Sequence, residues 1–285
     1  MQLTRTQFVG AAVSLGLIVP AGALAATITG GPGNERLRGT MGADQIDGAG
    51  GNDRIHGFGG ADSLDGGSGN DRVFGGRGDD TIVGLQGNDL LSGGPGDDQI
   101  TGDVNGAGDL TSFDRIFGGS GNDKLRGGDS SDRIAGGQGN DESSGENGND
   151  RMSGGSGDDT QSGGAGNDVI VANRGVDTSF GGDGDDVLWA LARGDVAPGP
   201  GVDQVGDTLD GGNGDDVLHT RDGEVDRITC GAGNDRALLD DVDVIADATA
   251  AAPNGSCEVV VRKAPKGAGY SRSEDRQESP KTPTR

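Results

Sequence analysis

The stretch from Gly66 to Ile82 reads GGSGNDRVF and then GGRGDDTI, which is one nine-residue unit followed by most of a second. Each unit opens with two glycines, carries a third glycine at its fourth position and Asp at its sixth, and places a branched apolar residue at its eighth, here Val73 and Ile82. A short period in which glycine and Asp keep one phase is typical of a solenoid, whose repeats pack only against their neighbours. The rest of the chain is therefore interpreted through its repeats.

Eight such units run without a gap from Gly30 to Thr101, and we assign residues 26–101 to a first block. Short strands at the eighth positions, stacked about 4.8 Å apart, would bury their side chains in a narrow shared core. Glycine is expected where tight turns need a positive φ or a close backbone approach. The eighth positions are Leu37, Ile46, Ile55, Leu64, Val73, Ile82, Leu91 and Ile100, and the sixth positions are Glu35, Asp44, Asp53, Asp62, Asp71, Asp80, Asp89 and Asp98.

A second block of eight units, residues 118–189, follows an interruption at 102–117 that inserts seven residues before the phase returns. Its core position is polar at Ser143, Gln161 and Ser179. Because two units form one coil, residues 18 apart are expected to stack on one sheet, and the opposite sheet keeps an apolar core. We predict that this is the weakest part of the roll and that Ile at position 161 would strengthen it. The apolar positions opposite are Ile134, Met152, Ile170 and Leu188.

Residues 190–210 form a second interruption, and whether Pro198–Gly206 hides one more unit is left open. Degenerate repeats and a cap are expected over 211–261, with Asp207, Asp216, Asp226 and Asp235 in looser phase and a last strand in the segment Cys257-Glu258-Val259-Val260-Val261. A disulfide between Cys230 and Cys257 would close this end of the solenoid and stabilise it by roughly 3–4 kcal/mol in the loop-entropy model. Two free thiols are the alternative.

The two ends of the chain differ from the repeats. Residues 1–25 have the pattern of a secretory leader, with Arg5, an apolar run and small residues before a cleavage site after Ala25. A membrane anchor is the alternative, but an apolar run of about 12 residues is short for a bilayer that needs roughly 20. Residues 262–285 carry no apolar period and are predicted to be a disordered, basic tail, either a solvated end or a tether to an acidic polymer or to the roll itself.

The composition excludes an ordinary globular core, since the 285 residues include 61 glycines and only 3% aromatic residues. Such a composition would by itself indicate disorder, but the fixed phase of the glycines argues against it. The net charge of −24 disfavours nucleic acid and anionic membranes as partners and favours cations. Two cysteines behind a leader favour an oxidising space outside the cytoplasm, so we expect a secreted, extracellular or cell-surface protein.

The repeats resemble the glycine-rich, calcium-binding nonapeptide of RTX-type (haemolysin-type) proteins, GGxGxDxUx with U apolar. The resemblance covers most of the chain. It implies an all-β fold, a parallel β-roll or β-solenoid, to which the disulfide would add a closed C-terminal cap. The family's repeats often follow an enzyme or toxin domain, and we recognise neither in this chain.

Calcium is the metal that this pattern favours. Aspartates 18 residues apart would stack about 5 Å apart and repel each other, and a hard cation would remove that repulsion. Carboxylate and carbonyl oxygens suit Ca²⁺, whose six to eight ligands tolerate irregular geometry better than those of Mg²⁺ do. The resemblance implies that several ions lie between stacked turns, each held by two Asp carboxylates and by glycine-loop carbonyls. The ligands would be Asp53, Asp62, Asp71, Asp80, Asp89, Asp98, Asp123, Asp132, Asp141, Asp150, Asp159, Asp168 and Asp186.

Some units depart from the consensus, and sites there are left open. The departures are Glu35, Thr40, Ser130 and the turn 172–175. The alternative to metal binding is that Asp merely decorates solvent-facing turns, although the strict period argues against it.

The expected function is a secreted, non-enzymatic calcium-binding repeat protein whose β-roll folds on binding Ca²⁺. We recognise no catalytic triad, zinc motif or phosphate loop, and His56 and His219 occupy outward ninth positions. The alternative is a calcium-stiffened adhesion or matrix protein that binds another protein or a glycan. One sheet is expected to carry a column of arginines beside aromatic residues, and this face is either solvated or an interface. These residues are Arg36, Arg54, Arg72, Arg115, Arg133 and Arg151, with Phe74, Phe117 and Trp189.

Overall fold

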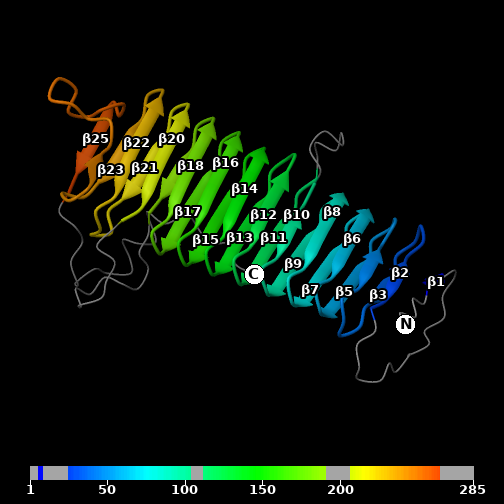
Figure 1. Cartoon of the computed structure of the whole chain (residues 1–285). Helices are drawn as coiled ribbons and strands as arrows, with labels where there is room; N and C mark the ends of the chain where they lie inside the picture. Colours follow the sequence, from blue (N-terminus) through cyan, green and yellow to red (C-terminus); the bar gives the residue numbers. More distant parts are fainter. Residues whose placement is uncertain (1–5, 9–24, 104–111, 191–205, 264–285) are drawn as a thin grey trace, which may run out of the picture.

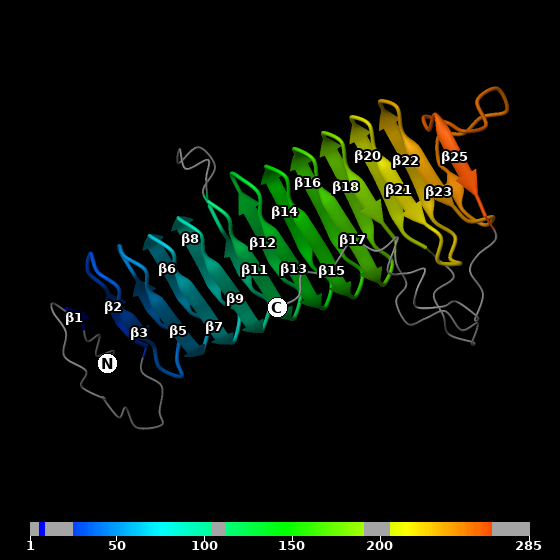
Figure 2. The ribbon, with the colours of Figure 1, turned by 180° about the vertical axis from the view of Figure 1, so that it is seen from behind.

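The computed structural model describes residues 6–8, 25–103, 112–190 and 206–263. Within these ranges, all the regular secondary structure is β-strand. The strands form two parallel sheets that face each other along an elongated roll (Figures 1 and 2). We call the 13-stranded sheet, β1-β2-β4-β6-β8-β10-β12-β14-β16-β18-β20-β22-β24, sheet A, and the 12-stranded sheet, β25-β23-β21-β19-β17-β15-β13-β11-β9-β7-β5-β3, sheet B. No helix in these ranges is long and apolar enough to cross a membrane.

The strands of sheet A lie side by side in chain order. They are β1 (Thr6–Phe8), β2 (Thr27–Thr29), β4 (Gln45–Asp47), β6 (Ser63–Ser68), β8 (Thr81–Gln86), β10 (Gln99–Thr101), β12 (Lys124–Gly128), β14 (Glu142–Asn147), β16 (Thr160–Ala165), β18 (Thr178–Asp183), β20 (Thr208–Asn213), β22 (Arg227–Ala232) and β24 (Val244–Ile245).

Sheet B holds the strands between them. They are β3 (Arg36–Arg38), β5 (Arg54–Gly59), β7 (Arg72–Arg77), β9 (Leu90–Pro95), β11 (Arg115–Ser120), β13 (Arg133–Gln138), β15 (Arg151–Ser156), β17 (Val169–Arg174), β19 (Val187–Trp189), β21 (Val217–Thr220), β23 (Arg236–Leu239) and β25 (Val259–Arg262).

From β2 onward, consecutive strands alternate between the sheets, so one coil takes two nonapeptides. Ile55 therefore pairs with Val73 on sheet B, and Leu64 pairs with Ile82 on sheet A. This arrangement confirms the predicted all-β parallel β-roll. Its shared core is the row of eighth-position side chains, which are buried from Leu37 to Ile245.

Most strands are longer than expected. We predicted only short strands around each core position, but many strands have six residues because the pairing continues through the glycines of the next unit. Gly137 shows how this works: its φ is +127°, and a Cβ added there would lie 2.1 Å from the carbonyl oxygen of Gly119. Glycine thus lets the chain turn while its backbone stays paired with the neighbouring coil.

The polar core residues stack on sheet A as predicted, since Ser143 pairs with Gln161 and Gln161 with Ser179. All three are buried. Gln161 does more than replace an apolar side chain. With its amide oriented to match its neighbours, it accepts from the Gly154 N–H at 2.9 Å and donates to the Val171 carbonyl at 3.3 Å. Both partners belong to sheet B, so this side chain links the two sheets across the core.

The two interruptions leave the order of the strands unchanged. Across the first, Gln99 of β10 pairs with Lys124 of β12, seven residues beyond the usual spacing of 18. Across the second, Thr178 of β18 pairs directly with Thr208 of β20. No strand therefore stands between β18 and β20 in sheet A, although most of Pro198–Gly206 lies outside the described residues.

The C-terminal end carries the predicted disulfide between Cys230 of β22 and Cys257, which confirms the closed cap. The last strand, β25, begins at Val259, two residues later than expected. At the other end, β1 (Thr6–Phe8) pairs with β2. The described residues leave out most of the predicted leader, including the residues just before the predicted cleavage site. They also leave out nearly all of the basic tail.

Candidate metal centre

The sixth-position aspartates form two ladders, one before the strands of sheet B and one before those of sheet A. In each step, the Oδ1 atom of one Asp accepts from the backbone N–H of the Asp one coil earlier. Asp71 accepts from Asp53 at 2.7 Å, and Asp80 accepts from Asp62 at 2.9 Å. Because every step points the same way, each carboxylate is fixed against the coil on its N-terminal side.

The structure brings together all nine pairs of stacked aspartates that the repeat period predicts, each through such a hydrogen bond. These pairs are Asp53 with Asp71, Asp62 with Asp80, Asp71 with Asp89, Asp80 with Asp98, Asp123 with Asp141, Asp132 with Asp150, Asp141 with Asp159, Asp150 with Asp168, and Asp168 with Asp186.

The ladders also continue across the first interruption, which the sequence did not indicate. Asp89 pairs with Asp114, and Asp98 pairs with Asp123, although each pair is separated by 25 residues. The seven extra residues therefore leave the stack of carboxylates unbroken.

The second oxygen of each ladder aspartate is left over. In all thirteen residues predicted as ligands, Oδ2 is buried and has no hydrogen-bond partner. A buried carboxylate oxygen without a partner is costly, and it points to a missing positive group. The same holds for four residues that the prediction omitted, namely Asp177, Asp216, Asp226 and Asp235. Asp216 ends the regular unit GGNGDD and could have been found from the consensus alone.

Backbone carbonyls complete the donor set. A Cβ added at Gly75, the first glycine of its unit, would lie 2.1 Å from Oδ2 of Asp80 and 2.9 Å from the carbonyl oxygen of Gly93. Both oxygens therefore face the space beside the bare Cα of this glycine. Carboxylate and carbonyl oxygens are the ligands that Ca²⁺ takes in proteins. The residues present fit a hard cation, and any side chain at the first glycine would fill the space.

The electrostatics of the ladders agree with this fit. Burial raises the pKa of Asp89 to about 8, helped by the charges of Asp114 and Asp71, and the N–H of Asp71 opposes the rise without cancelling it. Burial likewise raises the pKa of Asp132 to about 8, with Asp114 and Asp150 contributing repulsion. Without a cation, the ionised ladder is therefore unfavourable at neutral pH.

The family model of the RTX calcium-binding nonapeptide repeat (4 copies) matches residues 29–64, 38–73, 56–91, 74–104, 111–142, 144–161, 153–188 and 206–237. The chain belongs to this family. These matches cover more than half of the sequence, and the chain is a calcium-binding repeat protein with a β-roll fold. The comparison with curated proteins returned no match.

Two units that depart from the RTX consensus differ in whether an aspartate oxygen is left for a metal ion. At Asp44, both carboxylate oxygens accept from Thr40, Oδ2 from its N–H and Oδ1 from its hydroxyl. The oxygen that is left over elsewhere is thus occupied here. In the turn 172–175, Asn173 takes the glycine conformation with φ +96°, and Oδ2 of the following Asp177 is again without a partner.

The two histidines of the RTX roll lie on its outside, next to aromatic rings. His56 stacks on Phe58 and Phe74 at ring distances of 5.2 and 4.8 Å, and His219 stacks on Trp189 at 3.7 Å. In the described part of the chain, the clustered groups that could hold a metal include neither histidine.

Proposed function

We propose that this RTX protein is exported and non-enzymatic, and that its β-roll assembles when Ca²⁺ neutralises the aspartate ladders. The observation that carries the proposal is that Oδ2 is buried and without a partner in all thirteen predicted ligands. Such a structure is costly to form at neutral pH until a cation binds, so binding free energy becomes folding free energy.

Different groups of each repeat have different roles in this proposal. Oδ1 of each Asp positions the neighbouring coil, Oδ2 and the first-glycine carbonyls provide the oxygens for the ion, and the eighth-position side chains supply the apolar core. The disulfide suits an oxidising compartment. Residues 1–25 would provide the export signal, and an extracellular space would supply the calcium.

A calcium titration of the full chain tests the proposal. Circular dichroism should change from coil to β as Ca²⁺ rises through roughly 0.1–1 mM, the range of extracellular sites. Mg²⁺ should substitute poorly, because it demands near-octahedral geometry and keeps its water. A β spectrum that persists unchanged in calcium-depleted buffer would contradict the proposal.

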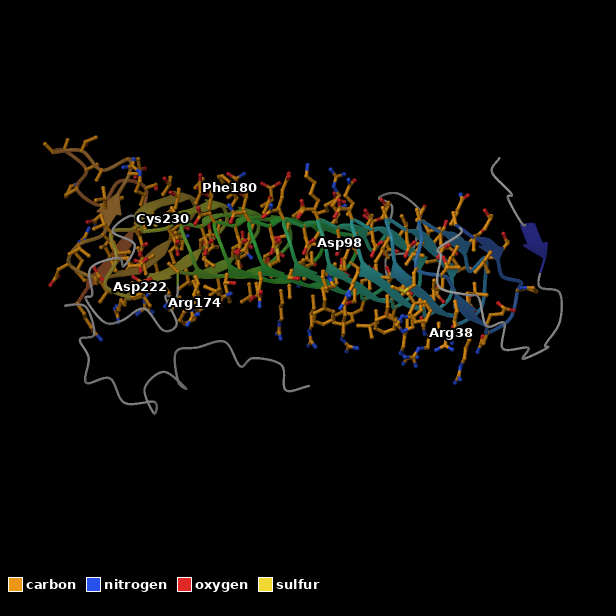
Figure 3. The ribbon with its side chains drawn as sticks, turned by 60° about the horizontal axis from the view of Figure 1, so that its bottom comes forward. Arg38, Asp98, Arg174, Phe180, Asp222 and Cys230 are labelled. Atoms are coloured by element: carbon orange, nitrogen blue, oxygen red, sulfur yellow. A yellow bond between two sulfur atoms is a disulfide. The ribbon has the colours of Figure 1, made fainter. Side chains whose placement is uncertain are left out.

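A second candidate function, attachment to an acidic glycan, rests on the outer face of sheet B. We call the predicted arginines, Arg36, Arg54, Arg72, Arg115, Arg133 and Arg151, together with Arg38, the arginine column. Arg115 lies between Leu90 and Arg133 in one register, so the column reaches through both blocks of repeats and is interrupted by Leu90 between Arg72 and Arg115. Figure 3 shows Arg38 and Arg174 on one side of the roll and Phe180 on the other.

Four arginines of the column lie over aromatic rings, and among the described residues none of the column forms a salt bridge. Arg38 lies over Phe58 at 5.6 Å, Arg54 over Phe74 at 5.6 Å, and Arg115 and Arg133 over Phe113 at 5.3 and 5.2 Å. The salt bridge found among described residues, Lys124 to Glu142, lies on sheet A. These guanidinium groups therefore keep their charge available, and arginine beside aromatic rings is common where carboxylate or sulfate groups bind.

Charge removal tests this surface. Replacing Arg115→Gln, Arg133→Ser and Arg151→Thr should reduce retention of the calcium-loaded protein on a sulfated polysaccharide column. The matched control replaces Lys124→Gln, Arg126→Ser and Arg227→Thr, which removes the same charge from sheet A. Equal retention of both variants would leave sheet B as a solvated face.

A further inference from the structure

The turn between β21 and β22 lacks the glycines of a regular unit. Residues 221–226 read RDGEVD, so side chains occupy the edge where other coils expose bare glycine backbone. The turn is held in shape locally, since Oδ1 of Asp222 accepts from the Glu224 N–H and Oδ2 of Asp240 accepts from the Gly223 N–H.

Three carboxylates meet at this turn. Asp207 and Asp226 are successive members of the sheet A ladder, and the Asp207 N–H donates to Oδ1 of Asp226 at 2.7 Å. Asp222 approaches from the turn itself. One carboxylate oxygen from each of the three lies within 4.8 Å of those of the other two.

Asp226 provides an independent sign that a cation belongs here. Its exposed fraction is 0%, and its Oδ2 has no hydrogen-bond partner. Burial raises its pKa strongly, and the largest charge contribution comes from Asp222 and not from its ladder neighbours. Among the described residues, Asp226 forms no salt bridge with a lysine or arginine.

We propose that Asp207, Asp222 and Asp226 form a three-carboxylate calcium site within the sheet A ladder, in which the Asp222 side chain takes the place that glycine backbone has in the regular repeats. With three carboxylates, the site carries one more negative charge than a site between two ladder aspartates. Ligand charge count is a main determinant of Ca²⁺ affinity, so this site binds Ca²⁺ and trivalent lanthanides more tightly than the regular sites.

The inference rests on the proposed function, because the cluster exists only in the folded roll. Its location gives it a specific reporter. Trp189 is the single tryptophan of the chain, and it stacks on His219, three residues before Asp222. Tryptophan-sensitised Tb³⁺ emission therefore reports on ions bound near Trp189. These include the neighbouring regular site of Asp186 and Asp216, so the comparison of variants assigns the signal to this turn.

The experiment titrates Tb³⁺ into the calcium-loaded full chain and compares Asp222→Asn with Asp241→Asn. Asn at position 222 keeps the oxygen that accepts from the Glu224 N–H and removes the charge. Asp241 is an exposed acid at the next turn of the same edge, so its variant is the matched control. We expect a tight emission step of one equivalent in the wild type, weakened about tenfold or more in Asp222→Asn and unchanged in Asp241→Asn.

The outcomes separate the two proposals. Equal emission in wild type and Asp222→Asn, with circular dichroism intact, would overturn the three-carboxylate site alone. If Ca²⁺ does not change the circular dichroism of the wild type, that result would instead overturn the proposed folding mechanism. If Asp222→Asn fails to fold, the wild-type titration still decides, because a wild type without the one-equivalent step has no such site.

Discussion

A ladder aspartate uses its two oxygens for different purposes, and this division sets what a substitution will do. Oδ1 holds a backbone N–H of the preceding coil, which a neutral Asn can also do. Oδ2 is buried without a partner, and only a charged oxygen there provides strong attraction for a cation.

Replacing Asp80 with Asn should therefore weaken calcium binding while leaving the turn intact. We expect the Ca²⁺ concentration at the midpoint of folding, followed by circular dichroism, to rise about tenfold. The control is Asp79→Asn in the same turn. Asp79 is exposed, its Oδ1 accepts from the Asp97 N–H, and many other units carry Asn at this position.

If both substitutions shift the midpoint equally, the effect would come from net charge and not from the ladder. If neither shifts it, Asp80 is not a ligand.

Most of the ladder was predictable at this scale because a repeat places like residues in like positions. What the period did not predict depends on contacts between coils. The direction of the N–H to Oδ1 bonds, and the approach of Asp222 to Asp207 and Asp226, are set by how the coils stack. Nothing in the spacing of RDGEVD relative to Asp207 indicates that contact.

Among the strands, β14, β16 and β18 share a polar core column that the sequence shows directly. The sequence also suggested that Ile would improve position 161, and the structure gives a reason to expect otherwise. Gln161 holds the Gly154 N–H and the Val171 carbonyl of the facing sheet, and both groups would lose that partner. A buried N–H left unpaired costs about 1–3 kcal/mol, enough to offset the added apolar surface.

We therefore predict opposite results at two neighbouring positions of the column. Ser143→Val should raise the free energy of unfolding by about 1 kcal/mol, since it adds buried apolar surface at a position that is already 5% exposed. Gln161→Ile should give no increase. Denaturant unfolding in saturating calcium measures both, and amide exchange in β14–β18 shows whether the change is local.

A clear gain in stability from Gln161→Ile would show that the hydrogen bonds of Gln161 to the facing sheet contribute less than the apolar packing that Ile adds.

Many strands are longer than the sequence suggested. They could not be expected from an apolar pattern of three residues, because glycines at positive φ continue the pairing without contributing a side chain.

The molecule as a whole carries a net charge of −24, and much of its buried acid lies in the two ladders. An Asp has a pKa of about 3.9 when unfolded, whereas burial raises that of Asp98 and Asp168 to about 7 and that of Asp89 to about 8. A raised pKa in the folded state means that the folded state binds more protons. This contribution to stability is complete below about pH 4 and is lost as the pH rises through 7 to 8.

In calcium-depleted buffer, the β content should consequently be higher near pH 5 than at pH 8, because protons replace the missing cations. The measurement is circular dichroism across this range, kept above the isoelectric point of about 4.2 to limit precipitation. Saturating Ca²⁺ should remove the decline toward pH 8, since the ion stabilises the ionised carboxylates. A calcium-free roll whose β content rises with pH would contradict the cost assigned to the buried ladders.

The alternation of strands between the two sheets has a consequence for how such a chain can change in length. Loss or duplication of a single nonapeptide would send every later strand to the opposite sheet, turning the downstream half of the rod by half a turn. The arginine column would then break into two segments facing opposite ways. Gains and losses must come in pairs of repeats to preserve the face, whereas an insertion between two strands can have any length if the flanking strands keep their register, as β10 and β11 do. The parity of the repeats, more than their number, is what selection on a one-sided surface would conserve.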